Sequence, residues 1–155
     1  MLNHNGELQE FDEVTITPSN RAFNYGDAVF ETVKIVNGKV VFWEDHYFRL
    51  MASMRMLRMK IPIEFTLEFL EEEILRTVET LEGNTNLRAK LTVFRKDGGF
   101  YKPTTNKVDY LIEVKEILSE VQEKYVVDLY KDFYLYSGLL STVKSNNKLV
   151  NTLAS

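Results

Sequence analysis

The chain of 155 residues contains no cysteine, only three prolines and only two histidines. Without cysteine, disulfides, cysteine-ligated metal sites and thiol catalysis are all excluded. The two histidines, His4 and His46, lack the HxxxH spacing of a zinc site, and the sequence has no DxDxDG calcium loop. We therefore expect no metal site.

Long apolar runs and clusters of positive charge are also missing. No stretch approaches the roughly 20 apolar residues that a membrane-spanning helix requires, and residues 1–13 lack the basic-then-apolar order of a signal peptide. A net charge of −4 without a basic face gives no argument for nucleic-acid binding. We expect a cytoplasmic protein that binds neither membranes nor nucleic acid.

Four segments of the chain have the composition of strands. Residues 29–36 are rich in β-branched side chains, and Asn37-Gly38 is typical of the type I′ turn that joins a hairpin to a returning strand at 39–43. Residues 87–94 and 108–115 alternate between apolar and polar side chains. They predict a second hairpin, whose long loop contains glycine, proline and threonine and is a candidate functional loop.

Two segments have apolar residues at helical spacing. The first covers 44–59 and stops before Pro62. The second runs from Leu67 to Leu81, and Gly83-Asn84 provides a natural C-terminal stop. We expect both to be amphipathic helices that pack against the strands.

These elements predict an α+β fold: a small two-layer α/β domain of two hairpins and two helices over residues 1–116. A linker is expected over 117–124. New strand patterns at 125–136, and a loop leading into a helix at 144–155, predict that 125–155 begins a second, mostly β domain. Because the last residues stop within an apolar helical pattern without a cap, we expect this domain to be incomplete and the chain to be a fragment.

Two charged side chains in the first half could serve a site. Glu31 shares one strand face with Val29, Val33 and Ile35, and a buried carboxylate requires either a partner or a role. From this feature alone, a partly exposed strand face or a structural ion pair with an arginine is the better explanation. Arg49 lies beside the apolar stripe of the first helix, where its guanidinium could bind a phosphate or carboxylate or could simply be solvated.

Two further side chains lie later in the chain. Arg95 ends a strand next to the Gly98-Gly99 loop, which suits either the binding of an anionic substrate or an ordinary hairpin turn. Lys144 follows apolar and small residues and precedes an Asn-rich helix start. Half-buried lysines can have a depressed pKa that makes the amine available for Schiff-base chemistry, although an ordinary surface lysine fits the spacing equally well.

Four motifs taken together resemble one enzyme family. RAFNYGDAVFET (21–32), H-x-x-R-L (46–50), R-x-x-G-G (95–99) and K-S-x-N-x-L-V-x-x-L-A (144–154) occur in the order and approximate spacing of the class IV, or fold-type IV, pyridoxal-phosphate enzymes. This family includes branched-chain and D-amino-acid aminotransferases and aminodeoxychorismate lyase. The resemblance covers essentially the whole chain and corresponds to the N-terminal half of these enzymes.

The resemblance implies a role for each candidate residue. Lys144 would form the Schiff base with pyridoxal 5′-phosphate and move the proton between the substrate Cα and the cofactor. Arg49 would bind the cofactor phosphate. Phe30 and Glu31 would lie near the substrate, and the Arg95 loop would border the substrate pocket, often that of the neighbouring subunit in a homodimer.

The resemblance also implies the reaction, the transfer of an amino group between an amino acid and a 2-oxo acid. Lys148-Leu149 replaces the Asn-Tyr that follows the lysine in many branched-chain enzymes. A 4-amino-4-deoxychorismate lyase that releases pyruvate is therefore the second expectation. The third, prompted by the abrupt end of the chain, is an inactive fragment that acts only as a dimerisation or binding module.

Overall fold

A computed structural model of the protein describes residues 1–13, 16–81, 86–117, 124–132, 134 and 136–155. One sheet of six antiparallel strands dominates the fold, in the order β2-β1-β6-β5-β3-β4. The strands are β1 (Leu2–His4), β2 (Glu7–Gln9), β3 (Ala28–Val36), β4 (Lys39–Val40), β5 (Asn86–Arg95) and β6 (Val108–Glu116).

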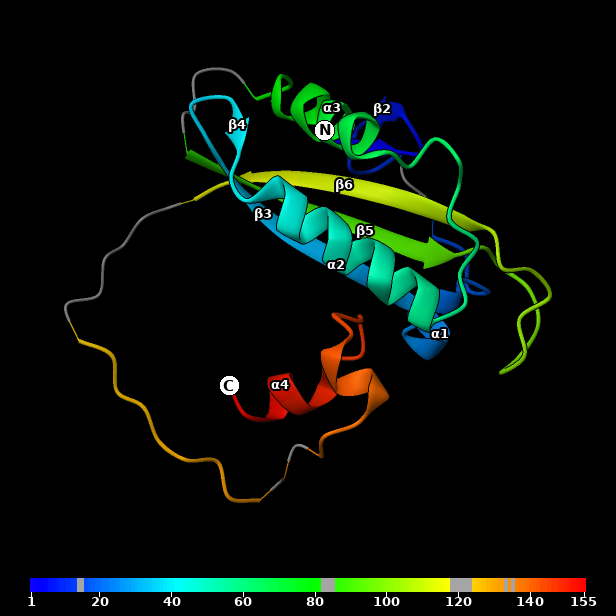
Figure 1. Ribbon diagram of the computed structural model, residues 1–155, viewed down its shortest axis with the longest axis vertical. Coiled ribbons are helices and arrows are strands. Elements are labelled where there is room, and N and C mark those ends of the chain that lie inside the picture. Colours follow the sequence, from blue (N-terminus) through cyan, green and yellow to red (C-terminus); the bar gives the residue numbers. More distant parts are fainter. Residues whose placement is uncertain (14–15, 82–85, 118–123, 133, 135) are drawn as a thin grey trace.

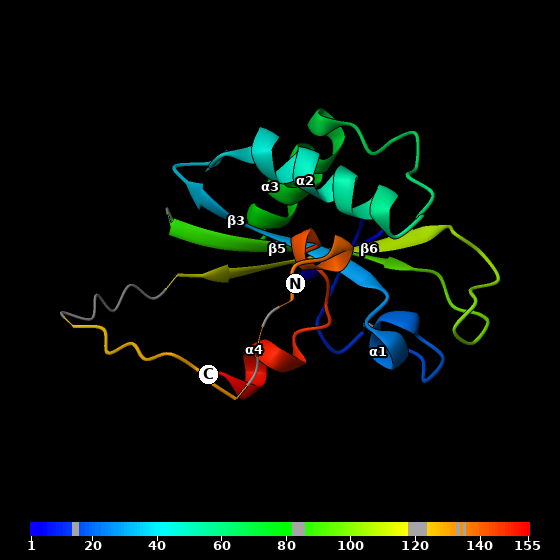
Figure 2. The ribbon, with the colours of Figure 1, turned by 60° about the horizontal axis from the view of Figure 1, so that its bottom comes forward.

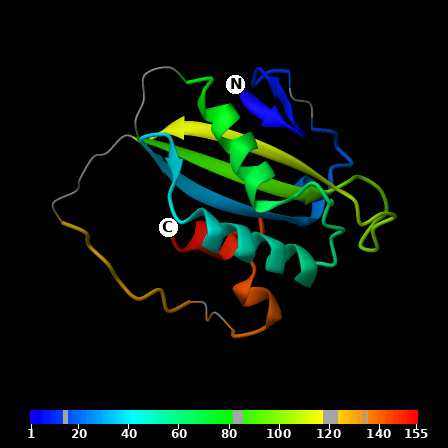
Figure 3. The ribbon, with the colours of Figure 1, turned by 45° about the horizontal axis from the view of Figure 1, so that its top comes forward.

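Two helices cover one face of this sheet. α2 (Trp43–Met56) lies along β3, and α3 (Leu67–Val78) lies over β5 and β6 (Figures 1 and 3). Three short helical segments, α1 (Arg21–Tyr25), η1 (Leu139–Thr142) and α4 (Leu149–Leu153), complete the described structure. The predicted α+β architecture and its two-layer domain are confirmed.

The core lies between the sheet and these two helices. As predicted, alternate residues of each central strand are buried, and they belong to one apolar cluster with the buried side chains of α2 and α3. Burial of an apolar side chain of this size contributes about 1.5–3 kcal/mol, so this layer accounts for most of the favourable free energy of folding. The largest buried side chains include Val29, Val33, Ile35, Leu50, Met54, Leu70, Ile74, Leu87, Leu91, Val93 and Ile112.

The returning strand of the first predicted hairpin is shorter than expected. Asn37 and Gly38 both have positive φ, as the expected turn requires, but β4 contains only Lys39–Val40 instead of 39–43. Phe42 adopts a left-handed conformation, and α2 begins at Trp43, whose indole N–H donates to the carbonyl of Leu67 at 2.8 Å. Burial of the Trp43 ring against α3 therefore ends the strand.

The N-terminal hairpin of β1 and β2 was not predicted. Its turn is Asn5-Gly6, with φ of 53° and 88°, the same dipeptide type as Asn37-Gly38. The flanking strands are only three residues long, too short for their alternation to be recognised. Asn3 is fully buried and donates to Glu73 Oε2 at 2.8 Å, which ties β1 to α3.

The strands predicted over 125–136 are absent from the described residues of that range. These residues follow the sheet as an extended, exposed segment (Figure 2). Val126 is 99% exposed, and a strand needs a neighbour to receive its backbone hydrogen bonds. The helix expected near the end of the chain is present as α4, whereas the predicted stop at Gly83-Asn84 and most of the predicted linker 117–124 lie outside the described residues.

The sequence predicted neither a membrane-spanning helix nor a metal site, and the described residues bear on both expectations. None of its helices combines the length and the apolar character that spanning a bilayer requires. No group of three or more metal-ligating side chains gathers among the same residues.

Candidate active site

Glu31 is the centre of a hydrogen-bonded cluster between β3 and α2. Its carboxylate is only 1% exposed. Oε1 accepts from Nε of Arg49 at 2.7 Å, and Oε2 accepts from Nη2 of Arg49 at 2.5 Å. Nδ1 of His46, if it carries the proton, donates to Oε2 at 2.7 Å. The buried charge is therefore compensated by a bidentate guanidinium and an imidazole.

The sequence of α2 explains why His46 and Arg49 reach the same carboxylate. Residues three apart lie on the same side of a helix, and both project toward β3. Nη2 of Arg49 also lies 3.1 Å from Nδ1 of His46. Arg49 remains 46% exposed, and its hydrogen bonds to the described residues use Nε and Nη2 rather than Nη1. One edge of the guanidinium is thus free to bind an anion.

Lys144 reaches this cluster along the free edge of β3. The amide of Phe30 donates to the carbonyl of Lys144 at 2.9 Å, and the amide of Asn146 donates to the carbonyl of Ala28 at 3.0 Å. Val143 is buried in the core and anchors the segment from the other side. These contacts join two distant parts of the chain (Figure 2).

Gly26 permits this approach. Its φ of +62° lies in the left-handed region, where it ends α1, and an added Cβ would lie 3.4 Å from Cβ of Asn147. A larger residue would strain the turn and press on the Lys144 segment. The Gly-Asp turn seen in the sequence is therefore the place where β3 receives the lysine segment.

The Lys144 amine lies between two neighbouring residues of β3. Its Nζ atom is 3.7 Å from Oε2 of Glu31 and 5.0 Å from the ring centroid of Phe30. Because successive side chains of a strand point to opposite faces, Phe30 lies on the open face while Glu31 lies under α2. Lys144 at the strand edge can contact both.

Burial and charge shift the pKa values of this cluster in definite directions. Burial alone would raise the pKa of Glu31, but the hydrogen bonds from Arg49 and His46 and the charges of Arg49 and Lys144 outweigh it and lower that pKa. Burial lowers the pKa of Lys144, assisted by the charges of Arg49 and Lys148 and opposed by Glu31. Glu31 thus stays ionised, while Lys144 releases its proton more easily than an exposed lysine.

Arg95 lies outside this cluster. It is 5% exposed and donates from Nε to Oδ2 of Asp27 at 2.9 Å, from Nη1 to Oδ1 of Asn106 at 2.5 Å and from Nη2 to the carbonyl of Leu57 at 2.6 Å. These bonds tie the end of β5 to the end of α2. Its predicted contact with the substrate stays a prediction.

Arg21 shares the carboxylate of Asp27 with Arg95. Its Nε donates to Oδ2 of Asp27 at 2.8 Å, and its Nη1 donates to the carbonyls of Gly98, Gly99 and Phe100. Asp27 therefore compensates two buried guanidiniums, one of which holds the long loop. Neither Arg21 nor Asp27 was predicted to build the site, although both lie in the RAFNYGDAVFET motif and Asp27 directly follows the Gly26 turn.

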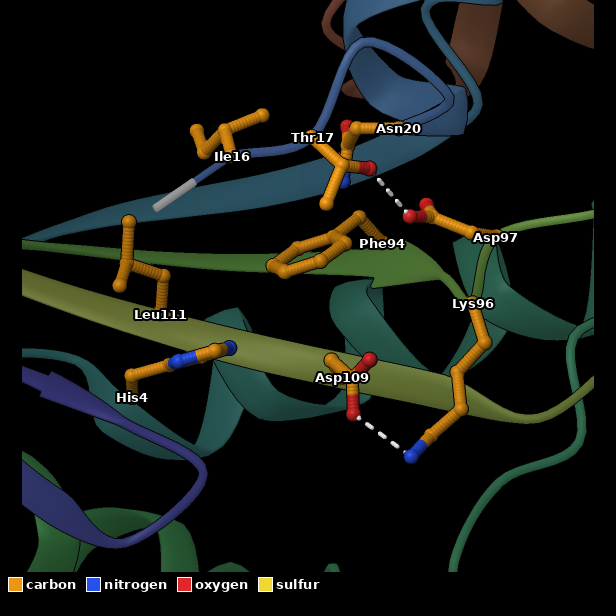
Figure 4. A pocket seen from close by; sticks show the side chains of 9 residues that line it. All are labelled: His4, Ile16, Thr17, Asn20, Phe94, Lys96, Asp97, Asp109 and Leu111. Carbon is orange, nitrogen blue, oxygen red and sulfur yellow. Dashed lines mark hydrogen bonds and ion pairs between the residues drawn. The ribbon is translucent and has the colours of Figure 1, made fainter. Parts of the chain in front are cut away.

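Two hollows lie near these elements. One, of about 430 Å³, is lined by Arg95 and Tyr101 on one side and by Ser145 and Asn147 on the other. The second, of about 370 Å³, lies on the open face of β5 and β6 under residues 16–20 (Figure 4). None of the predicted site residues lines the second hollow. Its lining residues are His4, Ile16, Thr17, Asn20, Phe94, Lys96, Asp97, Asp109 and Leu111.

The structure thus brings together four of the five predicted site residues, namely Phe30, Glu31, Arg49 and Lys144. Arg49 and the Lys144 amine both approach Oε2 of Glu31, and the pKa of Lys144 is lowered, mainly by burial. The family model described as amino-transferase class IV matches residues 28–155, which include all of them. The chain belongs to the class IV aminotransferases.

Curated relatives of this class IV chain include both transferases and a lyase. It is 26% identical over 104 residues to a D-alanine aminotransferase of Listeria monocytogenes, covering 67% of this chain and 34% of that protein. It is 28% identical over 125 residues to the aminodeoxychorismate lyase of Bacillus subtilis, covering 77% of this chain and 41% of that protein. The chain spans well under half the length of these relatives.

Solved structures share the fold. The branched-chain aminotransferase of Thermoproteus uzoniensis with norvaline superposes with a TM-score of 0.77 at 20% identity, covering 98% of this chain and 53% of that chain. The T.th. branched-chain aminotransferase with pyridoxamine 5′-phosphate gives a TM-score of 0.68 at 22% identity, covering 79% and 41%. The sheet and its two helices therefore have the fold of the corresponding part of these enzymes.

Proposed function

We propose that the protein is a pyridoxal-phosphate-dependent aminotransferase that moves an amino group between an amino acid and a 2-oxo acid. The observation that carries this proposal is the position of the Lys144 amine, 3.7 Å from a buried Glu31 that also binds Arg49, in a chain of the class IV family. The bound cofactor would supply an electron sink for the bond that breaks at the substrate Cα.

The residues of the cluster fit this cofactor. Glu31 binds Nε and Nη2 of Arg49, and the half-exposed outer side of that guanidinium can still bind an added anion such as a phosphate. The free Nη1 edge of Arg49 would bind the phosphate, and the Lys144 amine would hold the aldehyde end. Glu31 would fix the orientation of Arg49 by its two hydrogen bonds.

Lys144 would also move the proton. Its lowered pKa raises the fraction of neutral amine near pH 7, and a neutral amine can accept the proton from the substrate Cα. The Lys144 amine, once protonated, can donate this proton to a different atom of the bound substrate or cofactor. The Phe30 ring, whose centroid is 5.0 Å from Nζ, would shield one side of the amine from water.

We further propose that the protein acts as a homodimer in the cytoplasm and that the Arg95 loop borders the substrate. The loop carries Phe100 and Tyr101, which are 84% and 92% exposed, and the Tyr101 ring lies close to that of Tyr25. Exposed aromatic side chains that lie close together are typical of a protein–protein interface. Light scattering of the purified protein would give twice the monomer mass; a monomer at micromolar concentration would contradict the dimer.

An aminodeoxychorismate lyase is the second candidate, favoured by the coverage of 77% of this chain in the match to that enzyme. Product analysis separates the two functions. With the protein as its gene encodes it and added pyridoxal phosphate, an aminotransferase forms a 2-oxo acid only in proportion to an amino acceptor. The lyase forms pyruvate from 4-amino-4-deoxychorismate without any amino acceptor. This result would contradict the proposed aminotransferase activity and support the lyase.

A further inference from the structure

The sheet contains two hairpin turns with the same Asn-Gly dipeptide. Asn5-Gly6 joins β1 to β2, and Asn37-Gly38 joins β3 to β4. The φ angles are 53° and 88° in the first turn and 50° and 72° in the second. Both asparagines are exposed. The same two residue types thus meet solvent in similar backbone conformations, so any difference in their chemistry comes from the surroundings.

An Asn-Gly dipeptide can modify itself. The glycine amide nitrogen attacks Cγ of the asparagine, because glycine has no Cβ to obstruct the approach. A bond from this nitrogen to Cγ forms, the bond from Cγ to Nδ2 breaks, and ammonia leaves with the amide proton. Water then opens the succinimide ring at one of its two carbonyls and produces aspartate or isoaspartate. The reaction consumes one water, releases one ammonia and needs no other reactant.

Hydrogen bonds hold the first turn closed. Nδ2 of Asn5, the leaving group of the reaction, donates to Oδ1 of Asp109 at 2.9 Å. Oδ1 of Asn5 accepts from the amide of Tyr110 at 2.8 Å. The amide of Gly6, which would be the nucleophile, donates to Oδ1 of Asn3 at 2.9 Å. All three bonds must break before Asn5 can react.

The second turn lacks this support. Among the residues that the structure describes, none shares a side-chain hydrogen bond with Asn37. A Cβ added at Gly38 would meet no atom within 4 Å. The following strand β4 has only two residues and lies at the edge of the sheet, where it pairs with β3 alone (Figure 1). Ring closure requires rotation of the Asn37 backbone, and a short edge strand opens at low cost in free energy.

We propose that Asn37 is a site of spontaneous deamidation and that the hydrogen bonds of the first turn protect Asn5 from the same reaction. The net free energies of three hydrogen bonds reduce the reactive population of Asn5 by at least about 10-fold. The modification is independent of the proposed aminotransferase activity. It depends only on water and on the two neighbouring residues.

The turn at Asn37 joins the strand that carries Glu31 to the helix that carries Arg49. Its register is fixed by the pairing of Val36 with Lys39 across only two residues. Isoaspartate adds one carbon to the backbone of the turn, and this extra length is absorbed by opening β4. Aspartate keeps the original backbone, and Asp-Gly is itself a favoured turn dipeptide. The isoaspartate product should therefore loosen the hairpin, whereas the aspartate product should preserve it.

The test ages the protein as its gene encodes it in mildly alkaline buffer, both folded and unfolded in guanidinium chloride. Peptide mass spectrometry measures the conversion of amide to carboxyl at Asn37 and Asn5, and an isoaspartyl methyltransferase quantifies isoaspartate. Asp109→Ala removes one partner of Asn5, and Asp12→Ala, at an exposed position, is the matched control.

We expect Asn37 to react at least about 10-fold faster than Asn5 in the folded protein, and the two rates to become similar after unfolding. Asp109→Ala should speed the reaction of Asn5, and Asp12→Ala should not. Equal rates in the folded protein, or an Asn37 that reacts only after unfolding, would overturn the inference. Neither result bears on cofactor binding at Lys144, so the proposed function would stand.

The effect on β4 is tested separately by urea unfolding. The aged protein should unfold at a lower urea concentration than freshly prepared Asn37→Asp, in which the turn keeps its backbone length. Aged Asn37→Ser, which cannot form isoaspartate at this turn, is the control for damage elsewhere. A midpoint of the aged protein equal to that of either variant would contradict the loosened hairpin.

Discussion

The Nζ atom of Lys144 lies 3.7 Å from Oε2 of Glu31, although the two residues come from distant parts of the chain. The same oxygen accepts hydrogen bonds from Arg49 and His46. Glu31 therefore links the amine that would hold the cofactor to the guanidinium that would bind its phosphate. Changes at this one carboxylate should affect the charge of Lys144, the position of Arg49 and the stability of the fold.

The first prediction concerns the pKa of Lys144. The Glu31 charge opposes the lowering of that pKa, so Glu31→Gln should lower it further. Reductive ¹³C-methylation followed by NMR titration measures each lysine, and Lys144→Arg identifies the signal. Glu113→Gln is the control, because Glu113 pairs with Lys115. An unchanged or raised Lys144 pKa in Glu31→Gln would show that the two groups do not interact in solution.

The second prediction concerns stability against pH. The pKa of Glu31 is lowered in the folded state from a reference value of 4.5. Its charge therefore stabilises the fold fully above about pH 4.5, and this contribution is lost as the pH falls through the lower folded-state pKa. Glu31→Gln should lower the free energy of unfolding by about 1–3 kcal/mol at pH 7, because it breaks a buried ion pair whose arginine is half-exposed.

Urea unfolding at pH 7 and at pH 3 measures this difference. The gap between the unsubstituted protein and Glu31→Gln should shrink at the lower pH. A gap that is the same at both values would mean that the carboxylate charge contributes nothing and that the substitution acts through packing alone.

The third prediction concerns Asp27, which compensates the buried guanidiniums of Arg21 and Arg95. Asp27→Asn should lower the free energy of unfolding by roughly 3–5 kcal/mol, since two buried positive charges lose their counter-charge. Asp12→Asn, at an exposed position, is the matched control. Thermal and urea unfolding measure both variants, and equal losses in the two would contradict the assigned role of Asp27.

Much of the fold followed from periodicity in the sequence. β3, β5 and β6 alternate clearly enough for their buried faces to be predicted, and each is nine or ten residues long. The hairpin of β1 and β2 was not predicted, because a three-residue strand is too short to show an alternation of apolar and polar residues. The strand patterns at 125–136 depend on a neighbouring strand that the described residues do not provide.

The candidate site was only partly readable from the sequence. The resemblance indicated Phe30, Glu31, Arg49 and Lys144, but their mutual distances depend on the bridge between Val29 and Ser145, which no local pattern reveals. His46 was noticed as part of the H-x-x-R-L motif, but not as a partner of Glu31. Its spacing of three residues from Arg49 was the signal that could have suggested this contact.

The fourth prediction concerns the role of Arg49 in cofactor binding. Arg49→Gln should weaken the binding of pyridoxal phosphate by about 10- to 100-fold, because a charge-assisted contact to the phosphate is lost. Arg55→Gln, on an exposed turn of the same helix, is the matched control. Absorbance titration with the cofactor measures both Kd values. If the Kd of Arg49→Gln for the cofactor is within twofold of the control, the proposed contact between Arg49 and the phosphate is wrong.

The most direct test of the proposed function is to find which lysine holds the cofactor. The protein as its gene encodes it is mixed with pyridoxal phosphate, reduced with borohydride and analysed by peptide mass spectrometry. We predict that the added phosphopyridoxyl mass lies on Lys144 and disappears in Lys144→Ala, whereas Lys90 and Lys148 stay unmodified. Stoichiometric modification of another lysine, or none at any lysine, would contradict the central claim that Lys144 is the cofactor-binding residue.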